Sequence, residues 1–319
     1  MSKDLSHYIR QIHKLRVNKV GGQAPYQPLL LLSLIELVEQ DIVIDNCFAI
    51  SPELISIFIK YRDRLSNGYY QADLAQPFYH MSKKDDAFWH LEPKPGHEEV
   101  LRSGGRLNTL KKLKDNVLYG YFDLELFEIL QNRIYRTTLI STIIDQWFPG
   151  EFEKVKELLQ IHSFEQLRLR LKESGGAIYS VEDVKDELVN EVRDAAFRKN
   201  LLILYDQRCT FCKLRIVSMF GENIVDGAHI KPFSKFRDDH YTNGLALCKN
   251  HHWAFDRGWF GIDQDYQVIV PHNRFTEEPP EASMSMYNFH GERISLPIQE
   301  DAYPSQEALR WHREAWKIV

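Results

Sequence analysis

The pattern of apolar and polar positions divides this chain of 319 residues into three regions. Residues 1–148 mix helix-like periodicity with short strand-like runs, which predicts an α+β domain. Residues 149–195 are charged and helical in pattern, and we interpret them as a connector. Residues 196–319 contain short strands and a helical C-terminal segment around a group of cysteines and histidines. The expected fold is therefore of the α+β class, with two domains that are each long enough to bury a core.

Local signals predict where several elements begin and end. Residues 28–38 predict an apolar helix with a proline near its first turn. Ser51 is expected to cap the next helix, because a proline and a glutamate follow it. Residues 76–81 and 87–91 predict two strands, with a turn at 83–86 between them.

The connector carries two further signals. Gly175 and Gly176 end a helical run, and they indicate either a hinge or, more simply, a helix C-cap. Ser180 stands three residues before Asp183, which is a capping-box pattern, and we expect a new helix to open there.

Composition restricts the possible partners. The formal net charge of -5 gives no overall attraction to nucleic acid, so DNA contacts would depend on local basic patches. The stretch from Arg102 to Lys114 is the best such patch, although a solvated helix face would have the same composition. No apolar run approaches the roughly 20 residues of a membrane span, and the first residues lack the apolar core of a signal peptide. We therefore expect a cytoplasmic protein, in which Cys47 would be a small buried apolar residue.

Three cysteines and a histidine have the spacing of a metal site. Cys209 and Cys212 form one Cys-x-x-Cys pair, and Cys248 and His251 form a second pair. Two such pairs supply the four ligands of a tetrahedral zinc ion, although His252 could take the place of His251. Zinc with four protein ligands has no open position, so the site would be structural. The simpler alternative is a set of buried free thiols beside a surface histidine.

The polar residues of this region that are not zinc ligands have the chemistry needed to hydrolyse a phosphodiester. His229 ends a strand-like segment, 224–230, where its ring could act as a general base for water. Asn243 lies in the loop before the next strand. His252 and Asp256 are four residues apart on a predicted helix, so they share one face and could bind one divalent cation. A base, a fixed loop and a cation are what the reaction needs.

Residues 197–263 resemble the HNH (ββα-metal) endonucleases, in the subgroup whose motif reads A-H-I-x-P … N-G-L-x-L-C-x-x-x-H-x-x-F-D. His229, Asn243 and His252 match the three letters of the motif. The resemblance implies that His229 is the general base and that Asn243 holds the loop that orients it. It also implies that His252 and Asp256 ligate Mg²⁺ or Mn²⁺, within a ββα fold stabilised by structural zinc.

One position departs from that family. Ala228 stands where many members have a metal-binding Asp or His immediately before the base, and Asp226 is the candidate substitute. The alternative for the whole region is a zinc-stabilised DNA-binding fold without catalysis.

Residues 15–32, L-R-V-N-K-V-G-G-Q-A-P-Y-Q-P-L-L-L-L, resemble the start of the sulfur-binding domains of modification-dependent restriction endonucleases. Those domains recognise phosphorothioate DNA, in which a soft, poorly hydrated sulfur replaces a phosphate oxygen and favours an apolar cup. The family tends to have basic residues or His at the positions of Tyr26 and Gln27, and Tyr at that of Gln76. The resemblance and the basic stretch together give the candidate DNA contacts: Lys19, Tyr26, Gln27, Pro77, Phe78, His80, Arg102 and Arg106.

The sequence therefore predicts a modification-dependent restriction endonuclease that binds phosphorothioate-modified double-stranded DNA through residues 1–148. The expected cofactors are structural Zn²⁺ and catalytic Mg²⁺ or Mn²⁺. The alternatives are an HNH nuclease that reads a methylated base or an unmodified sequence, a non-catalytic DNA-binding protein, and a nonspecific toxin-like nuclease. Because cutting both strands needs two active sites or two binding events, we favour a homodimer.

Overall fold

The computed structural model describes residues 3–15, 25–65, 73–83, 87–102, 107–218, 222–278 and 285–318. The chain forms two compact units, Met1–Gln166 and Leu167–Val319. Their boundary falls inside residues 149–195, the expected connector, and inside α10 (Ser163–Glu173). No helix in these described ranges has both the length and the apolar character needed to cross a bilayer.

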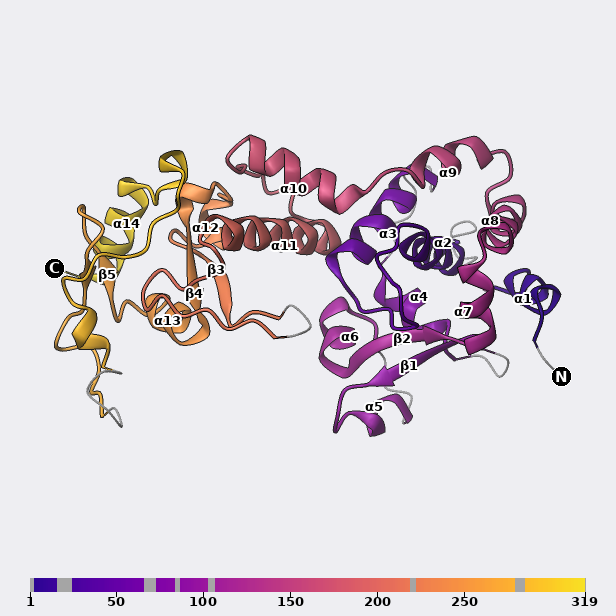
Figure 1. Cartoon of the computed structure of the whole chain (residues 1–319), viewed down its shortest axis with the longest axis horizontal. Helices are drawn as coiled ribbons and strands as arrows, with labels where there is room; N and C mark the ends of the chain where they lie inside the picture. The colour runs from indigo at the N-terminus through magenta and orange to yellow at the C-terminus, as the bar shows by residue number, and fades with distance from the viewer. Residues whose placement is uncertain are drawn as a thin grey trace. The chain divides into compact units, whose positions relative to one another are not determined.

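The first unit is built around α2 (Tyr26–Glu39), whose residues from position 27 to 38 are all buried. Helices α3, α4, α7 and α8 pack against it. The described helices of this unit other than α2 are α1 (Leu5–Ile12), α3 (Pro52–Leu65), α4 (Ala75–His80), α5 (Glu98–Arg102), α6 (Leu110–Asn116), α7 (Leu124–Gln131), α8 (Arg133–Trp147) and α9 (Phe152–Leu158) (Figure 1). The run of leucines that predicted an apolar helix therefore forms the centre of the core.

A short antiparallel sheet completes this unit. Strands β1 (Trp89–Pro93) and β2 (Val117–Phe122) pair with Trp89 opposite Phe122. Gly120 lies close to the indole of Trp89. A Cβ at position 120 would come within 2.1 Å of that ring. The strand predicted at 87–91 is thus present, shifted by two residues.

Two predictions for this unit need correction. Residues 76–81, expected as a strand, belong largely to helix α4, because the Asp73 carboxylate accepts a hydrogen bond from the Ala75 amide at 2.8 Å and Pro77 suits a first helical turn. Cys47, expected to be buried, is exposed, and its neighbour Phe48 fills the core instead. The cap at Ser51 is confirmed, since its hydroxyl accepts from the Leu54 amide at 3.2 Å.

The second unit contains a ββα arrangement packed on a long helix. Strands β3 (Val225–His229) and β4 (Gly244–Cys248) pair in antiparallel register, and α13 (Lys249–Phe255) follows directly. Helix α11 (Glu187–Leu204) contacts both strands, as does α13. The remaining described elements of this unit are α12 (Phe233–Phe236), η1 (Tyr241–Asn243), β5 (Gly261–Ile262), β6 (Val268–Ile269), η3 (Met286–Phe289), η4 (Glu300–Ala302) and α14 (Gln306–Trp316).

Two glycines let α11 approach the hairpin closely. A Cβ on Gly244 would lie 2.8 Å from the side chain of Leu201, and one on Gly227 would lie 3.0 Å from the Arg198 Cα. Larger residues at these positions would push the helix away from the strands. The hairpin end that carries His229 is therefore held against α11.

Of the two helix boundaries predicted before α11, one is confirmed and the other is shifted along the chain. Gly175 and Gly176 have φ angles of 71° and 113° and end α10, which confirms the C-cap interpretation. Ser180 and Asp183 form the reciprocal bonds of a capping box, at 2.8 and 3.2 Å, but they close an isolated turn. The expected helix begins only at residue 187, because the Asp186 carboxylate caps it.

Candidate functional site

The four predicted zinc ligands converge in the second unit. The ligand atoms of Cys209, Cys212, Cys248 and His251 all lie within 4.8 Å of one another. The first two come from the turns that follow α11, and the other two come from the end of β4 and the first turn of α13. His251 Nδ1 lies 3.1 Å from Cys248 Sγ and 3.6 Å from Cys209 Sγ.

These distances and donor types fit zinc. Tetrahedral Zn²⁺ with ordinary bond lengths separates sulfur and nitrogen ligands by about 3.6 Å. Burial alone would lower the pKa of His251, but its bonds and charge interactions with Cys212 and Cys248 raise that pKa to about 9. Zn²⁺ would bind the deprotonated forms of these ligands, so its binding would release protons. The alternative ligand His252 points elsewhere, towards Asp256.

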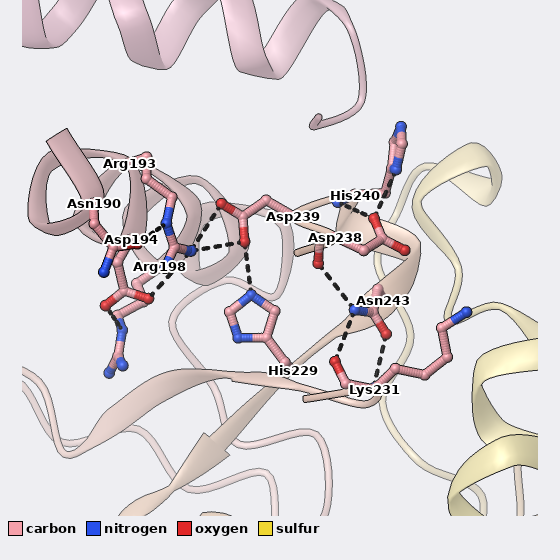
Figure 2. A network of polar contacts seen from close by, with 10 residues as sticks. All are labelled: Asn190, Arg193, Asp194, Arg198, His229, Lys231, Asp238, Asp239, His240 and Asn243. Carbon is pink, nitrogen blue, oxygen red and sulfur yellow. Dashed lines mark hydrogen bonds and ion pairs between the residues drawn. The ribbon is translucent and has the colours of Figure 1, made fainter. Parts of the chain in front are cut away.

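His229 lies at the last position of β3, opposite Gly244. Its ring stacks on Phe197 of α11, with 4.2 Å between ring centres and an angle of 8°. Its Nε2 is 2.8 Å from Oδ1 of Asp239, and Figure 2 shows the ring directed at that carboxylate. Because a carboxylate only accepts hydrogen bonds, Nε2 is the donor in this contact, and in the neutral imidazole Nδ1 is then the nitrogen with the lone pair. The geometry therefore gives His229 one basic nitrogen.

Asn243 closes the loop between His229 and β4. Its Oδ1 accepts from the Lys231 amide at 2.9 Å, and its Nδ2 donates to the carbonyls of Lys231 and Asp238 at 3.1 and 3.0 Å (Figure 2). The side chain is buried, so water does not replace these bonds. Asn243 thus joins the two ends of the loop, while its part in catalysis stays a prediction.

A cavity of 390 Å³ brings together His229, His252 and Asp256. His252 Nε2 lies 3.5 Å from Asp256 Oδ2 on the same face of α13. Burial lowers the pKa of His252 and raises that of Asp256, and their mutual attraction opposes both shifts. An imidazole lone pair and a carboxylate are suitable ligands for a divalent cation in such a cavity.

Helices on either side supply apolar walls to this cavity. Phe233 comes from α12, and Trp311 and Trp316 come from α14. His312 also lines it, but this ring stacks on Phe255 at 3.8 Å and its Nε2 donates to the Phe255 carbonyl. Burial lowers the pKa of His312 to about 4, which keeps the ring neutral and makes it part of the packing.

Asp226, the candidate substitute for a ligand at Ala228, makes other contacts. Its Oδ2 lies 2.5 Å from Arg198 and 3.0 Å from Lys249. Burial alone would raise the pKa of Asp226, but these two cations outweigh burial and lower it. Within the described ranges, the cysteine cluster is the only place where three or more Cys, His, Asp or Glu ligand atoms converge. A role for Asp226 in holding the catalytic cation therefore stays a prediction.

The predicted DNA contacts of the first unit differ in exposure. Helix α4 packs against α2, so the candidates at positions 26–27 and those at positions 77–80 lie on neighbouring helices. Gln27 and Pro77 are buried, and Phe78 is fully buried with its ring edge-on to Trp89, so a DNA contact by Phe78 would require the ring to leave the core. Tyr26 is half-buried, while His80 and Arg102 are exposed. Lys19 and Arg106 lie outside the described residues.

Sequence reasoning missed the residues that surround His229 from other elements. Asp239 and Arg193 contact each other in the interior, and Trp311 and Trp316 belong to a helix more than fifty residues beyond the motif. The only signal for Asp239 was a pair of aspartates, 238–239, in the loop after the base.

A family comparison covers the segment that contains this site. Residues 209–263 match the model of the HNH endonuclease family. No curated protein matches the chain. One solved structure that does match is a "Modification dependent TagI restriction endonuclease", at 25% identity and a TM-score of 0.28. The match covers 38% of this chain and 37% of that structure, so the chain spans little more than a third of it. Residues 209–263 therefore form a domain of the HNH endonuclease type.

Proposed function

We propose that this protein hydrolyses phosphodiester bonds in DNA with its second unit and selects phosphorothioate-modified DNA with its first. The observation that carries the catalytic part is the single cavity lined by His229, His252 and Asp256, inside a segment that matches the HNH endonuclease family. A basic nitrogen and a cation site within one cavity are the two components that metal-assisted hydrolysis requires.

In this proposal His229 accepts a proton at Nδ1 from the water that attacks the phosphorus. The hydrogen bond from Nε2 to Asp239 supports this assignment, because it leaves Nδ1 as the basic atom. His252 and Asp256 hold Mg²⁺ or Mn²⁺, which supplies positive charge to the phosphate oxygens when it is bound. The zinc held by the cysteine cluster has four protein ligands and takes no part in the chemistry.

The choice of target rests on the first unit and on its resemblance to sulfur-binding domains. Support comes from the packing of α4 on α2, and from the exposed His80 on the first of these helices. A phosphorothioate is the mark that the resemblance favours. A methylated base or an unmodified sequence is the competing target.

The experiment compares three plasmids that differ only in modification: phosphorothioate, methylated and unmodified. Each is incubated with the full chain and Mg²⁺ or Mn²⁺, and cleavage rates are measured. We expect the phosphorothioate plasmid to be cut preferentially. Equal cutting of all three would refute the proposed target but not the nuclease, whereas no cutting of any DNA would refute both.

A matched pair of variants tests the base. His229→Ala should abolish cleavage and retain DNA binding, because the ring lines the cavity but does not hold the zinc. His162→Ala is the control, since His162 is an exposed histidine of the first unit. Persistent cleavage by the His229 variant would rule out the assigned base.

A further inference from the structure

A buried ion pair lies directly behind His229. The carboxylate of Asp239 is 1% exposed and the side chain of Arg193, on α11, is 7% exposed. Arg193 Nη1 lies 3.0 Å from both carboxylate oxygens, and one of these oxygens also accepts from His229 Nε2 (Figure 2). The three side chains therefore form one chain of charge-assisted contacts that ends at the proposed base.

Arg193 is itself fixed from two further directions. Its Nε donates to Asn190 Oδ1 at 2.9 Å, one turn earlier on α11. The centre of its guanidinium lies 3.2 Å from the ring centre of Phe233, which also forms a wall of the catalytic cavity. The arginine thus has little freedom to move, and the orientation of the Asp239 carboxylate is determined with it.

Stability alone gives a poor account of this pair. Removing two charges from water carries a large desolvation cost, and apolar side chains of similar volume often stabilise a core as well or better. The nearby pair of Asp238 and His240 shows the ordinary arrangement, since its imidazole remains 39% exposed. Asp239 differs because its second partner is the histidine of the cavity.

We propose that Asp239 and Arg193 are positioning residues of the nuclease site. Asp239 fixes the tautomer of His229 with the proton on Nε2, and Arg193 holds the Asp239 carboxylate in its orientation. This inference rests on the proposed function of His229 as the general base. It adds Asp239 and Arg193 to the residues of the HNH motif. Arg193 lies on α11, before the matched segment begins.

The replacement Asp239→Asn separates this role from simple packing. An asparagine has the same shape, but its amide can donate a hydrogen bond to Nε2, which favours the tautomer with the proton on Nδ1. That tautomer has no lone pair at the nitrogen that would accept the proton of water. The turnover rate should therefore fall by about 10²-fold or more, as expected when a carboxylate no longer selects the tautomer of a catalytic histidine. Affinity for DNA should stay within about twofold, because Asp239 is buried.

The Arg193 contact offers a test by conservative replacement. A single nitrogen, Nη1, reaches both carboxylate oxygens, so a lysine ammonium could replace that part of the interaction. Arg193→Lys keeps the charge but loses the stacking on Phe233 and the bond to Asn190, so its turnover rate should lie between those of the wild type and Arg193→Met, and Arg193→Met should lose as much as Asp239→Asn. The matched control is Asp238→Asn, in the same loop, whose carboxylate contacts His240 and not His229.

The decisive experiment records ¹⁵N NMR spectra of the histidine side chains in the zinc-loaded full chain, with the His229 signal assigned through His229→Gln. We expect the Nε2–H tautomer in the wild type and in Asp238→Asn, and a shift towards Nδ1–H in Asp239→Asn. An Nδ1–H tautomer in the wild type would overturn the proposal even if every variant failed to fold. An unchanged turnover rate in a folded, zinc-loaded Asp239→Asn would also overturn it.

The spectra also separate this inference from the proposed function. The Nε2–H tautomer in a protein that cuts no DNA would support the contact between Asp239 and His229 but refute its role in a nuclease. Cleavage that persists in His229→Ala would remove the base assignment, and the positioning role would fall with it.

Discussion

Replacing Asn243 by alanine should destabilise the second unit by about 3 kcal/mol. The side chain makes three hydrogen bonds to the main chain of Lys231 and Asp238, and it is only 2% exposed. Each bond contributes about 1 kcal/mol net, and water has no access to the groups that the substitution leaves unpaired. Asn243→Asp should be at least as harmful, because it keeps the acceptor but turns a carboxylate oxygen towards two carbonyls.

The assay follows urea unfolding of the zinc-loaded full chain, with a chromogenic chelator that reports zinc release from the second unit. We expect the midpoint of zinc release to move to lower urea in Asn243→Ala. Asn250→Ala is the matched control, because Asn250 is exposed on α13, and its effect should stay within about 0.5 kcal/mol.

Cleavage should fall further than the loss of folded protein alone accounts for. Lys231 and Asp238 lie in the loop between β3 and β4 that also carries Asp239, and Asn243 ties the start of this loop to the residue before Asp239. A freed loop would release the carboxylate that orients His229. A stability loss below about 0.5 kcal/mol together with full activity would refute the loop-fixing role.

Three further changes test other parts of the structure. Cys248→Ser should reduce the bound zinc that native mass spectrometry measures. It should also abolish the unfolding transition of the second unit while that of the first unit remains. Full zinc occupancy in this variant would contradict the assigned ligands. Asp256→Ala should raise the Mg²⁺ concentration needed for half-maximal cleavage by about tenfold or more, and an unchanged requirement would remove Asp256 from the cation site. Burial raises the pKa of Glu36 from its ordinary 4.5 to about 7, although the Lys60 ammonium opposes this shift. The protonated carboxyl therefore stabilises the folded first unit fully below pH 4.5, and this contribution is lost as the pH rises through about 7. The pH dependence of the first unit's urea midpoint, followed by circular dichroism, should flatten in Glu36→Gln, and an identical profile would contradict the burial argument.

The sequence was sufficient wherever a short segment determines its own structure. Two features depend only on residues within a few positions, and both match the structure: the cap at Ser51 and the glycine cap at Gly175. The two ligand pairs between Cys209 and His251 also have local spacing within each pair, and the four ligand atoms converge as expected. The ββα order also followed from local signals, since each strand is bounded by turn residues and α13 begins directly after β4.

The errors occurred where packing decides between local alternatives. Residues 76–81 are a short apolar run, for which periodicity does not distinguish a helix from a strand. The cap from Asp73 and the packing of Phe78 on Trp89 together select the helix. Phe48 forms a β-bridge with Gly120 and is buried, and because successive side chains of extended backbone face opposite sides, its neighbour Cys47 faces outward. The pair of Arg193 and Asp239 is separated by 46 positions, so no local pattern could join them.

The hairpin explains why one small domain needs both a zinc site and a buried polar network. Two five-residue strands are marginal by themselves in water. At one end Val225 pairs with Cys248, a zinc ligand, and at the other end His229 pairs with Gly244, beside the loop that Asn243 closes. These ends are about 13 Å apart along the strand. Since the zinc cluster is too distant to orient the histidine ring, we expect the stacking on Phe197 and the hydrogen bond to Asp239 to do so, next to the loop that Asn243 closes.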